Sequence, residues 1–208
     1  MNRYTCLAPL YDVVSFEWPI YRTGRQAAID ALDLRPGQTV LDIGCGTGLS
    51  MPMLARRLGP SGHVVGVDAS ADMLRSARHH RRLPTSQTLI QADATQLKTD
   101  DLPAGLGPID AVLFAYSLSL MHPWMSAWRA TMQLVGPGAR IAIADMARPD
   151  RGGPVARAGA RALTAAGGSD IDAHPWHVLE QTCTDVQAQT FWGGHLQVRS
   201  GARPANDR

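Results

Sequence analysis

The sequence predicts an α/β fold: a single doubly wound domain around a mainly parallel seven-stranded sheet. Three observations indicate it. Short apolar strand-like segments alternate with amphipathic helical segments, those strands lack polar alternation, and the chain ends in a hairpin pattern. Strand–helix alternation produces parallel sheets with right-handed crossovers, and continuous apolar runs are typical of strands covered on both faces. We also expect an antiparallel C-terminal hairpin and an N-terminal helical cap.

The parallel strands are expected where short runs are rich in Val, Ile and Leu. In chain order they cover 38–43, 63–68, 87–93, 110–116 and 139–145. Helices are expected where apolar residues recur at three- and four-residue spacing. These segments are 49–58, 70–83 and 123–135. Pro52 suits a first helical turn, where a missing N–H is harmless, and Ser70 suits an N-cap.

Near the end of the chain, the alternation of strand and helix patterns gives way to two strand patterns in succession. Segments 186–192 and 195–201 are expected to be two strands joined by Gly193-Gly194, because glycines tolerate the positive φ angles of a two-residue hairpin turn. Three regions are predicted in order: a helical cap over the active site at 1–35, a ligand-binding domain at 36–200 and a flexible tail at 201–208.

Composition is that of an ordinary globular protein, with 45% hydrophobic and 18% charged residues among 208, enough for one well-buried domain. A net charge of +2 gives no reason to expect nucleic acid as a partner. The basic stretch 75–82 is interpreted as a solvated helix face, with peripheral contact to an anionic membrane as the alternative.

The cellular setting is expected to be cytoplasmic. The three cysteines form no CxxC pair, which argues for a reducing compartment. The N-terminal segment has no signal-peptide core. The longest apolar-leaning run, 111–121, has 11 residues and includes two serines, too short to span a membrane.

The segment VLDIGCGTGLS at 40–50 predicts a ligand cradle. Gly44, Gly46 and Gly48 follow an apolar strand, and glycine lets the backbone approach a ligand without an intervening Cβ. A dinucleotide fingerprint, G-x-G-x-x-G, would require a third glycine where Leu49 stands. The observed G-x-G-x-G spacing therefore favours a nucleoside over a pyrophosphate.

Three carboxylates are expected at neighbouring strand ends. Asp68 lies 20 residues beyond Gly48, where it can accept both hydroxyls of a ribose. Asp93 can accept a hydrogen bond from an adenine amine, and Asp42 can face an ammonium group. Three acidic groups suit a ligand with an amine, a ribose and an adenine, and would repel two phosphates. The alternative is that each aspartate caps a turn.

Four motifs in this order, VLDIGCGTG, VVGVDAS, QADAT and GPGARIAIADM, resemble those of the class I S-adenosylmethionine-dependent methyltransferases, over 37–146. The resemblance implies a Rossmann-like fold, S-adenosyl-L-methionine as cofactor and methyl transfer as the activity. It also implies cofactor-binding roles. These fall on Gly44, Gly46 and Gly48 around the methionine and ribose, on Asp68 at the ribose diol, and on Ala69, Met73, Asp93 and Ala94 at the adenine.

Two further stretches are similar to a narrower group. YTCLAPLYD at 4–12 is similar to the opening of quinone C-methyltransferases and bacterial phosphatidylethanolamine N-methyltransferases, and FAYSLSLMHPW at 114–124 to lipid N-methyltransferases. This likeness implies a small or amphipathic acceptor, a lipid amine or a quinone-like compound.

Methyl transfer from a sulfonium is an in-line displacement, so alignment rather than a nucleophilic side chain is the enzyme's main contribution. Tyr11, with Tyr4, is expected in the cap over the cofactor's methyl group. Tyr116, also a cofactor contact, follows the fourth strand. His122 is the nearby imidazole able to take a proton. The alternatives are that Tyr116 packs and that His122 caps a helix.

Other polar and aromatic residues have two interpretations each. Arg22 or Arg25 would pair with the cofactor carboxylate or be a surface charge. Trp18, Trp124 and Trp128 would pack in the core or line the acceptor mouth. His174 and His177 are expected to flank a helix start, and no metal site is predicted.

Two alternatives to the methyltransferase are weighed. An NAD(P)-dependent oxidoreductase would share the architecture, but Leu49 and the lack of a Tyr-x-x-x-Lys pair argue against it. A non-catalytic S-adenosylmethionine-binding protein would keep the same acidic strand ends.

Overall fold

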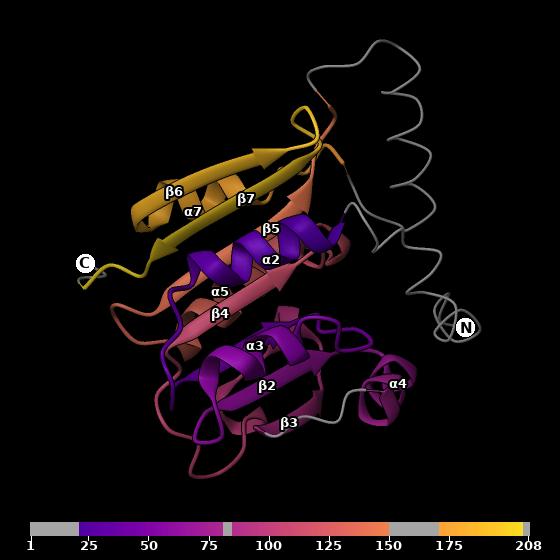
Figure 1. Cartoon of the computed structure of the whole chain (residues 1–208), viewed down its shortest axis with the longest axis vertical. Helices are drawn as coiled ribbons and strands as arrows, with labels where there is room; N and C mark the ends of the chain where they lie inside the picture. The colour runs from indigo at the N-terminus through magenta and orange to yellow at the C-terminus, as the bar shows by residue number, and fades with distance from the viewer. Residues whose placement is uncertain (1–20, 81–84, 150–170, 206–208) are drawn as a thin grey trace.

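The computed structural model describes residues 21–80, 85–149 and 171–205. Within these residues seven strands form one sheet in the order β3-β2-β1-β4-β5-β7-β6, as Figure 1 shows. The strands are β1 (Thr39–Ile43), β2 (His63–Asp68), β3 (Ser86–Gln91), β4 (Ala111–Ala115), β5 (Arg140–Met146), β6 (Thr184–Phe191) and β7 (Leu196–Ala202). The predicted α/β fold is confirmed.

The helices of the described residues are α2 (Arg22–Ala31), α3 (Met51–Leu58), α4 (Ala71–His80), α5 (Trp124–Leu134) and α7 (Trp176–Thr182), with short 3₁₀ helices η2 (Ala94–Gln96), η3 (Thr99–Asp101) and η4 (Leu118–Leu120). Among these, helix α2 precedes β1 and the other helices lie between strands along the chain. Pro52 lies in the first turn of α3, as predicted. The Ser70 hydroxyl accepts a hydrogen bond from Met73 N at 3.3 Å, as a residue preceding α4 should.

The sheet reverses its strand order at β1, which pairs in parallel with both β2 and β4. In doubly wound sheets, ligands bind beyond the carboxyl ends of the strands at such a reversal. Among the seven described strands, β7 alone runs in the direction opposite to the others, and it pairs antiparallel with β5 and β6. Residues that contact a ligand are therefore expected in the loops that follow β1, β2 and β4.

Helices cover both faces of the sheet. In Figure 1, α2 and α3 lie in front of the sheet and α5 and α7 behind it. Successive side chains of β1 alternate between two cores. Leu41 faces the core that holds Trp128 of α5, and Val40 faces the core that holds Ile29 of α2 and Leu54 of α3. Burial on both faces explains why the strands are continuously apolar.

Helix α2 packs directly on the sheet. Ala28 and Ile29 are fully buried, and the Tyr116 hydroxyl donates a hydrogen bond to the Tyr21 carbonyl at 2.8 Å. A Cβ at Gly24 would overlap the Tyr116 hydroxyl oxygen, so a residue without a side chain is required there. Residues 1–20 lie outside the described residues, and the division into cap, domain and tail stays a prediction.

Two local predictions were wrong. The third strand ends at Gln91, and Asp93 instead caps η2 by accepting a hydrogen bond from Thr95 N at 2.9 Å, because a short carboxylate competes for the backbone two residues on. The hairpin turn has four residues, 192–195, closed by His195 N on the Trp192 carbonyl at 3.3 Å.

No helix in the described ranges has the length and apolar character needed to cross a bilayer.

Replacing Gly24 with Ala should destabilise the protein, although helix propensity alone would stabilise it by about 1 kcal/mol. The new methyl group must displace the Tyr116 hydroxyl, and overpacking of this kind costs about 1–3 kcal/mol. Urea unfolding measures the net change. Gly107→Ala, where a Cβ meets no atom within 4 Å, should change stability by less than about 0.5 kcal/mol. A Gly24→Ala protein more stable than wild type would contradict this packing.

Candidate cofactor and acceptor site

The glycine bend, residues 44–48, links β1 to α3 in left-handed backbone conformations. The φ angles of Gly44, Gly46 and Gly48 are 70°, 55° and 81°, values that favour glycine. The Gly44 and Cys45 N–H groups both donate to the Val67 carbonyl, at 2.7 and 3.0 Å. The end of β2 therefore fixes the start of the bend.

The glycines of the bend differ in what their missing side chains allow. A Cβ on Gly46 would meet no atom within 4 Å, so its backbone faces open space that a ligand can enter. A Cβ on Gly44 would lie 2.5 Å from the Ser117 Cβ and 2.9 Å from the Met121 Cε. Gly44 thus makes room for the chain after β4, whereas Gly46 leaves room for a ligand.

Asp68 joins the end of β2 to the bend. Its Oδ2 accepts a hydrogen bond from Gly46 N at 2.8 Å, and its Oδ1 accepts one from Ser70 N at 2.8 Å. Burial raises the pKa of this carboxyl, and those two hydrogen bonds oppose the rise. Each carboxylate oxygen has a further lone pair, so Asp68 retains acceptor capacity toward a ligand at Gly46.

The residues expected around an adenine lie at the same edge of the sheet, because β3, β2 and β1 are neighbours. Ala69 is exposed immediately after β2, and Met73 is buried on α4. Asp93 is exposed, with its Oδ1 2.8 Å from the Thr95 hydroxyl, and Ala94 is buried. The residues expected around the adenine therefore follow β2 and β3, at the edge where these neighbouring strands end.

Asp42 is fully buried in β1, on the face covered by α2 and α3. Burial raises its pKa to about 7; the Asp68 charge adds to the rise, while the Arg25 charge and a hydrogen bond with Ser50 oppose it. Among the described groups, Asp42 Oδ2 has no hydrogen-bond partner. A buried carboxylate oxygen of this kind is costly, and a cationic group at the bend would offset that cost.

Arg25 is buried on α2 and is therefore not the surface charge that one interpretation expected. Its Nη1 donates to the Ser50 hydroxyl at 2.9 Å, and its guanidinium lies 5.4 Å from the centre of the Tyr116 ring. The helix thus supplies a positive charge close to Asp42. Arg22, on the same helix, is exposed.

Tyr116 follows β4 with a φ of 59°, a left-handed conformation that costs a bulky residue roughly 1–3 kcal/mol. Its hydroxyl is engaged by the Tyr21 carbonyl, and its ring packs against the Tyr21 ring at 5.1 Å between centroids. Ser117, the next residue, donates from its hydroxyl to the Ile43 carbonyl at 2.6 Å. The chain after β4 is thus held beside the glycine bend.

His122 is exposed after η4, with its Nδ1 3.4 Å from the Leu120 carbonyl oxygen. It does not cap the next helix, because α5 begins at Trp124 and Pro123 occupies the N-cap position. Tyr4, Tyr11 and Trp18 lie outside the described residues, so their expected places in the acceptor pocket remain predictions.

A buried pair that the sequence analysis missed lies on the far side of this loop. Asp145, at the end of β5, is fully buried. Its Oδ1 accepts from the Ser119 hydroxyl at 2.9 Å, and its Oδ2 accepts from Ser119 N at 3.2 Å. Burial raises the pKa of Asp145 to about 6. The signal was an aspartate near a strand end, like Asp42, in the motif GPGARIAIADM, from which no site residue was predicted.

The remaining candidates do not join this site. Trp128 is buried against Phe114, with ring centroids 6.1 Å apart, and half-buried Trp124 packs on the same core. His177 pairs with Glu180 at 2.8 Å. No group of three His, Cys, Asp or Glu side chains suited to a metal ion occurs in the part of the chain that the structure describes.

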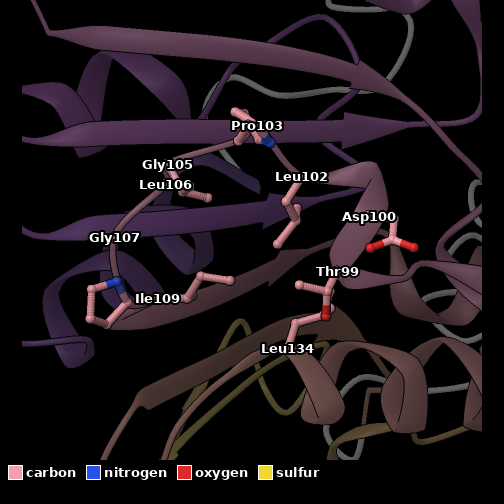
Figure 2. Close-up of a pocket in the computed structure, with 11 residues that line it drawn as sticks. Thr99, Asp100, Leu102, Pro103, Gly105, Leu106, Gly107, Ile109 and Leu134 are labelled. Atoms are coloured by element: carbon pink, nitrogen blue, oxygen red, sulfur yellow. The ribbon is translucent and has the colours of Figure 1, made fainter.

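A pocket of about 470 Å³ lies elsewhere, between the loop 99–109 and Leu134 of α5. Figure 2 shows the side chains that line it. Ile109 precedes β4, so the pocket lies at the amino end of that strand, away from the glycine bend. Its lining is mainly Leu, Pro and Gly, with Asp100 as the one charged side chain. This pocket offers no groups for the chemistry considered above.

Comparison with known proteins gives a consistent result. Residues 40–138 match the family model of a methyltransferase domain. The chain is 33% identical over 145 residues to the 2-phytyl-1,4-naphtoquinone methyltransferase of Thermosynechococcus vestitus, covering 69% of this chain and 62% of that protein. It is 30% identical over 151 residues to the ubiquinone/menaquinone biosynthesis C-methyltransferase UbiE of Idiomarina loihiensis, covering 70% of this chain and 58% of that protein. The chain thus spans about three fifths of the length of these relatives.

A solved structure extends the likeness over the whole fold. A SAM-dependent methyltransferase from Aquifex aeolicus matches with a TM-score of 0.64 at 17% identity, covering 92% of this chain and 97% of that one. Such low identity shows the fold alone. The family match, in contrast, includes the glycine bend and the strand-ending Asp42 and Asp68. Residues 40–138 thus form a methyltransferase domain, on a fold shared with a solved SAM-dependent methyltransferase.

Proposed function

We propose that this protein transfers the methyl group of S-adenosyl-L-methionine to a small or amphipathic acceptor of the quinone type. The observation that carries the proposal is the open space at Gly46, bordered by the Asp68 carboxylate. The two relatives described above, both named as quinone methyltransferases, favour a quinone-like acceptor. A lipid amine, which the N-terminal and post-β4 motifs also suggest, is the alternative acceptor.

The residues at the bend fit this cofactor. The Gly46 backbone would lie against the ribose and methionine parts, and Asp68 would accept hydrogen bonds from the ribose hydroxyls. The unsatisfied Oδ2 of Asp42 would be compensated by the cofactor's ammonium group. Ala69, Met73, Asp93 and Ala94 would surround the adenine. The carboxylates of Asp68 and Asp42 are thus matched to hydrogen-bond donors of the cofactor, and the residues after β2 and β3 are matched to its adenine.

When bound, the cofactor supplies an activated methyl carbon on a sulfonium, and the reaction is an in-line displacement. The chain's own residues then need to orient the two reactants and exclude water, which can contribute about 7–11 kcal/mol. In our proposal Tyr116 shapes the wall of the site, since its hydroxyl is engaged by the Tyr21 carbonyl. Exposed His122 can take a proton from the acceptor, and Tyr11 would close the site from the N-terminal cap.

An oxidoreductase on the same architecture has no observation in its favour. A dinucleotide needs two phosphates beside the bend, where buried Asp42 and half-buried Asp68 would repel them. A non-catalytic cofactor binder would use the same residues, and only a turnover measurement separates it from an enzyme. The expected cytoplasmic location and the peripheral membrane contact of the stretch 75–82 stay predictions.

Asp68→Ala should weaken binding of S-adenosylmethionine by roughly one to two powers of ten, since a hydrogen bond to a charged group contributes about 1.5–3 kcal/mol. Isothermal titration calorimetry measures the affinity, and circular dichroism checks the fold. Asp100→Ala, at an exposed carboxylate in η3, is the matched control and should bind normally. An unchanged dissociation constant in folded Asp68→Ala would remove Asp68 from the site.

The affinity for S-adenosylmethionine should rise with pH between 5 and 7. Asp42 has a pKa raised to about 7, so below that value the ligand-free site holds a neutral carboxyl. An incoming ammonium group favours the ionised form, and binding therefore releases a proton, giving up to about a tenfold gain per pH unit. Asp42→Asn should bind weakly and lose most of this dependence. Equal pH profiles for wild type and Asp42→Asn would contradict an ammonium at Asp42.

The same raised pKa has a consequence for stability without cofactor. The folded protein favours protonated Asp42 relative to the unfolded chain, so stability should fall as pH rises from about 4 through about 7. Each pKa unit corresponds to about 1.36 kcal/mol, which bounds the loss at about 4 kcal/mol. Urea unfolding of wild type and Asp42→Asn across this range isolates the Asp42 contribution; a constant difference between the two proteins would show that Asp42 titrates normally.

Methyl transfer itself is tested by incubating the protein with methyl-labelled S-adenosylmethionine and either reduced 2-phytyl-1,4-naphthoquinone or phosphatidylethanolamine, both in detergent. Label in the quinol is expected, and Asp68→Ala should slow its appearance. If only the phospholipid is labelled, the quinone assignment is wrong and the acceptor is a lipid amine. Cofactor binding without label in either compound, or in a whole-cell lipid extract, would contradict an enzyme and favour a cofactor-binding protein.

A further inference from the structure

The post-β4 segment, residues 116–121, is attached to three different elements. Tyr116 donates to the Tyr21 carbonyl beside α2, Ser117 donates to the Ile43 carbonyl at the end of β1, and Ser119 donates to Asp145 at the end of β5. The first two are hydrogen bonds from a side-chain hydroxyl to a backbone carbonyl. In the third, the acceptor is the buried side-chain carboxyl of Asp145.

The attachment to Asp145 is built from every polar atom of that side chain. Oδ1 accepts from the Ser119 hydroxyl at 2.9 Å and from Met146 N at 2.9 Å, and Oδ2 accepts from Ser119 N at 3.2 Å. Asp145 is fully buried and Ser119 is 1% exposed. Burying a carboxylate is unfavourable unless its hydrogen bonds are made. An apolar side chain would fill this position at lower cost, so packing alone does not explain an aspartate here.

The segment also contacts the glycine bend directly. The Ser117 side chain and the Met121 methyl group occupy the space that a Cβ on Gly44 would need. Tyr116, at the start of the segment, has a backbone conformation unfavourable for its residue type, and such conformations persist only where the surroundings enforce them. A shift of the segment would therefore change its contacts with the bend, where the cofactor is proposed to bind.

We propose that Asp145 is a positioning residue for methyl transfer. Through its two hydrogen bonds to Ser119 it fixes the post-β4 segment, and so sets the distance between groups on the acceptor side and a cofactor held at Gly46. This inference rests on the proposed function for its catalytic consequence, while its structural part concerns the segment alone. Asp145 touches neither reactant and acts through Ser119.

Amide hydrogen exchange tests the structural part without any acceptor. In Asp145→Asn, the new NH₂ group faces the donors Ser119 N or Met146 N, and in Ser119→Ala the hydroxyl is lost. Both variants should exchange the amides of 116–122 roughly tenfold faster or more, the scale expected from losing a hydrogen bond to a charged acceptor. Ser200→Ala, a buried serine in β7 whose hydroxyl has no partner among the described groups, should exchange as wild type.

Kinetics with methyl-labelled S-adenosylmethionine and reduced 2-phytyl-1,4-naphthoquinone test the catalytic part. Asp145→Asn and Ser119→Ala should lower kcat about tenfold while the cofactor dissociation constant stays within about threefold, the pattern of lost alignment rather than lost binding. Asp145→Asn combined with Ser119→Ala should cost little more than either change alone. Asp145→Glu, which keeps the charge but lengthens the side chain, should not restore the rate.

The outcomes are separable. Unchanged exchange over 116–122 in both folded variants would overturn the proposal, as would a loss of cofactor affinity that equals the loss of rate. If wild type transfers no methyl group to the quinol while exchange in the variants rises as expected, the acceptor assignment fails and the segment's dependence on Asp145 stands.

Discussion

The hydrogen bond from Gly46 N to the Asp68 carboxylate is the interaction on which the rest of the site depends. It joins the carboxyl ends of β1 and β2 at 2.8 Å, beside the point where the sheet reverses its strand order. Because Gly46 has no side chain, the backbone it holds faces open space. The same contact therefore fixes the shape of the bend and places an acceptor carboxylate beside it.

Buried charge is distributed on both sides of this bend. Asp42 lies under α2 and α3 with Arg25 and Ser50 nearby, and Asp145 lies at the end of β5 against Ser119. Both carboxyls have a raised pKa because they are buried. Carboxylates in apolar surroundings are tolerated where neighbours or ligands compensate them. Asp145 is compensated within the protein, whereas Asp42 retains an unsatisfied oxygen that suits a cationic ligand.

The fold was predictable because its signals are local. Continuous apolar strands, helical spacing and the glycine bend each lie within a dozen residues, and they predicted the parallel strands and the bend after the first of them. Strand ends were less predictable, since side-chain capping by Asp93 competes with strand extension. The four-residue turn at 192–195 likewise depends on how β6 and β7 pair.

The candidate site was predictable where strand ends carry it. Gly46 and Asp68 were predicted from the glycine spacing and from the strand that follows, whereas the burial of Arg25 depends on contact between α2 and Ser50, which is 25 residues away in sequence. The Asp145–Ser119 pair is likewise a contact between separate segments, as is the hydrogen bond from the Tyr116 hydroxyl to the Tyr21 carbonyl. Such contacts leave no pattern in a single sequence.

The central claim is that the glycine bend holds an adenosine bearing a charged sulfur. A crystal structure of the protein grown with S-adenosylhomocysteine, the product that keeps the adenosine and the amino acid end, tests it most directly. The account predicts density along Gly46, with the ribose hydroxyls within hydrogen-bonding distance of Asp68 and the ammonium next to Asp42. Density for the ligand at another place, with the bend empty or filled by a side chain, would contradict it.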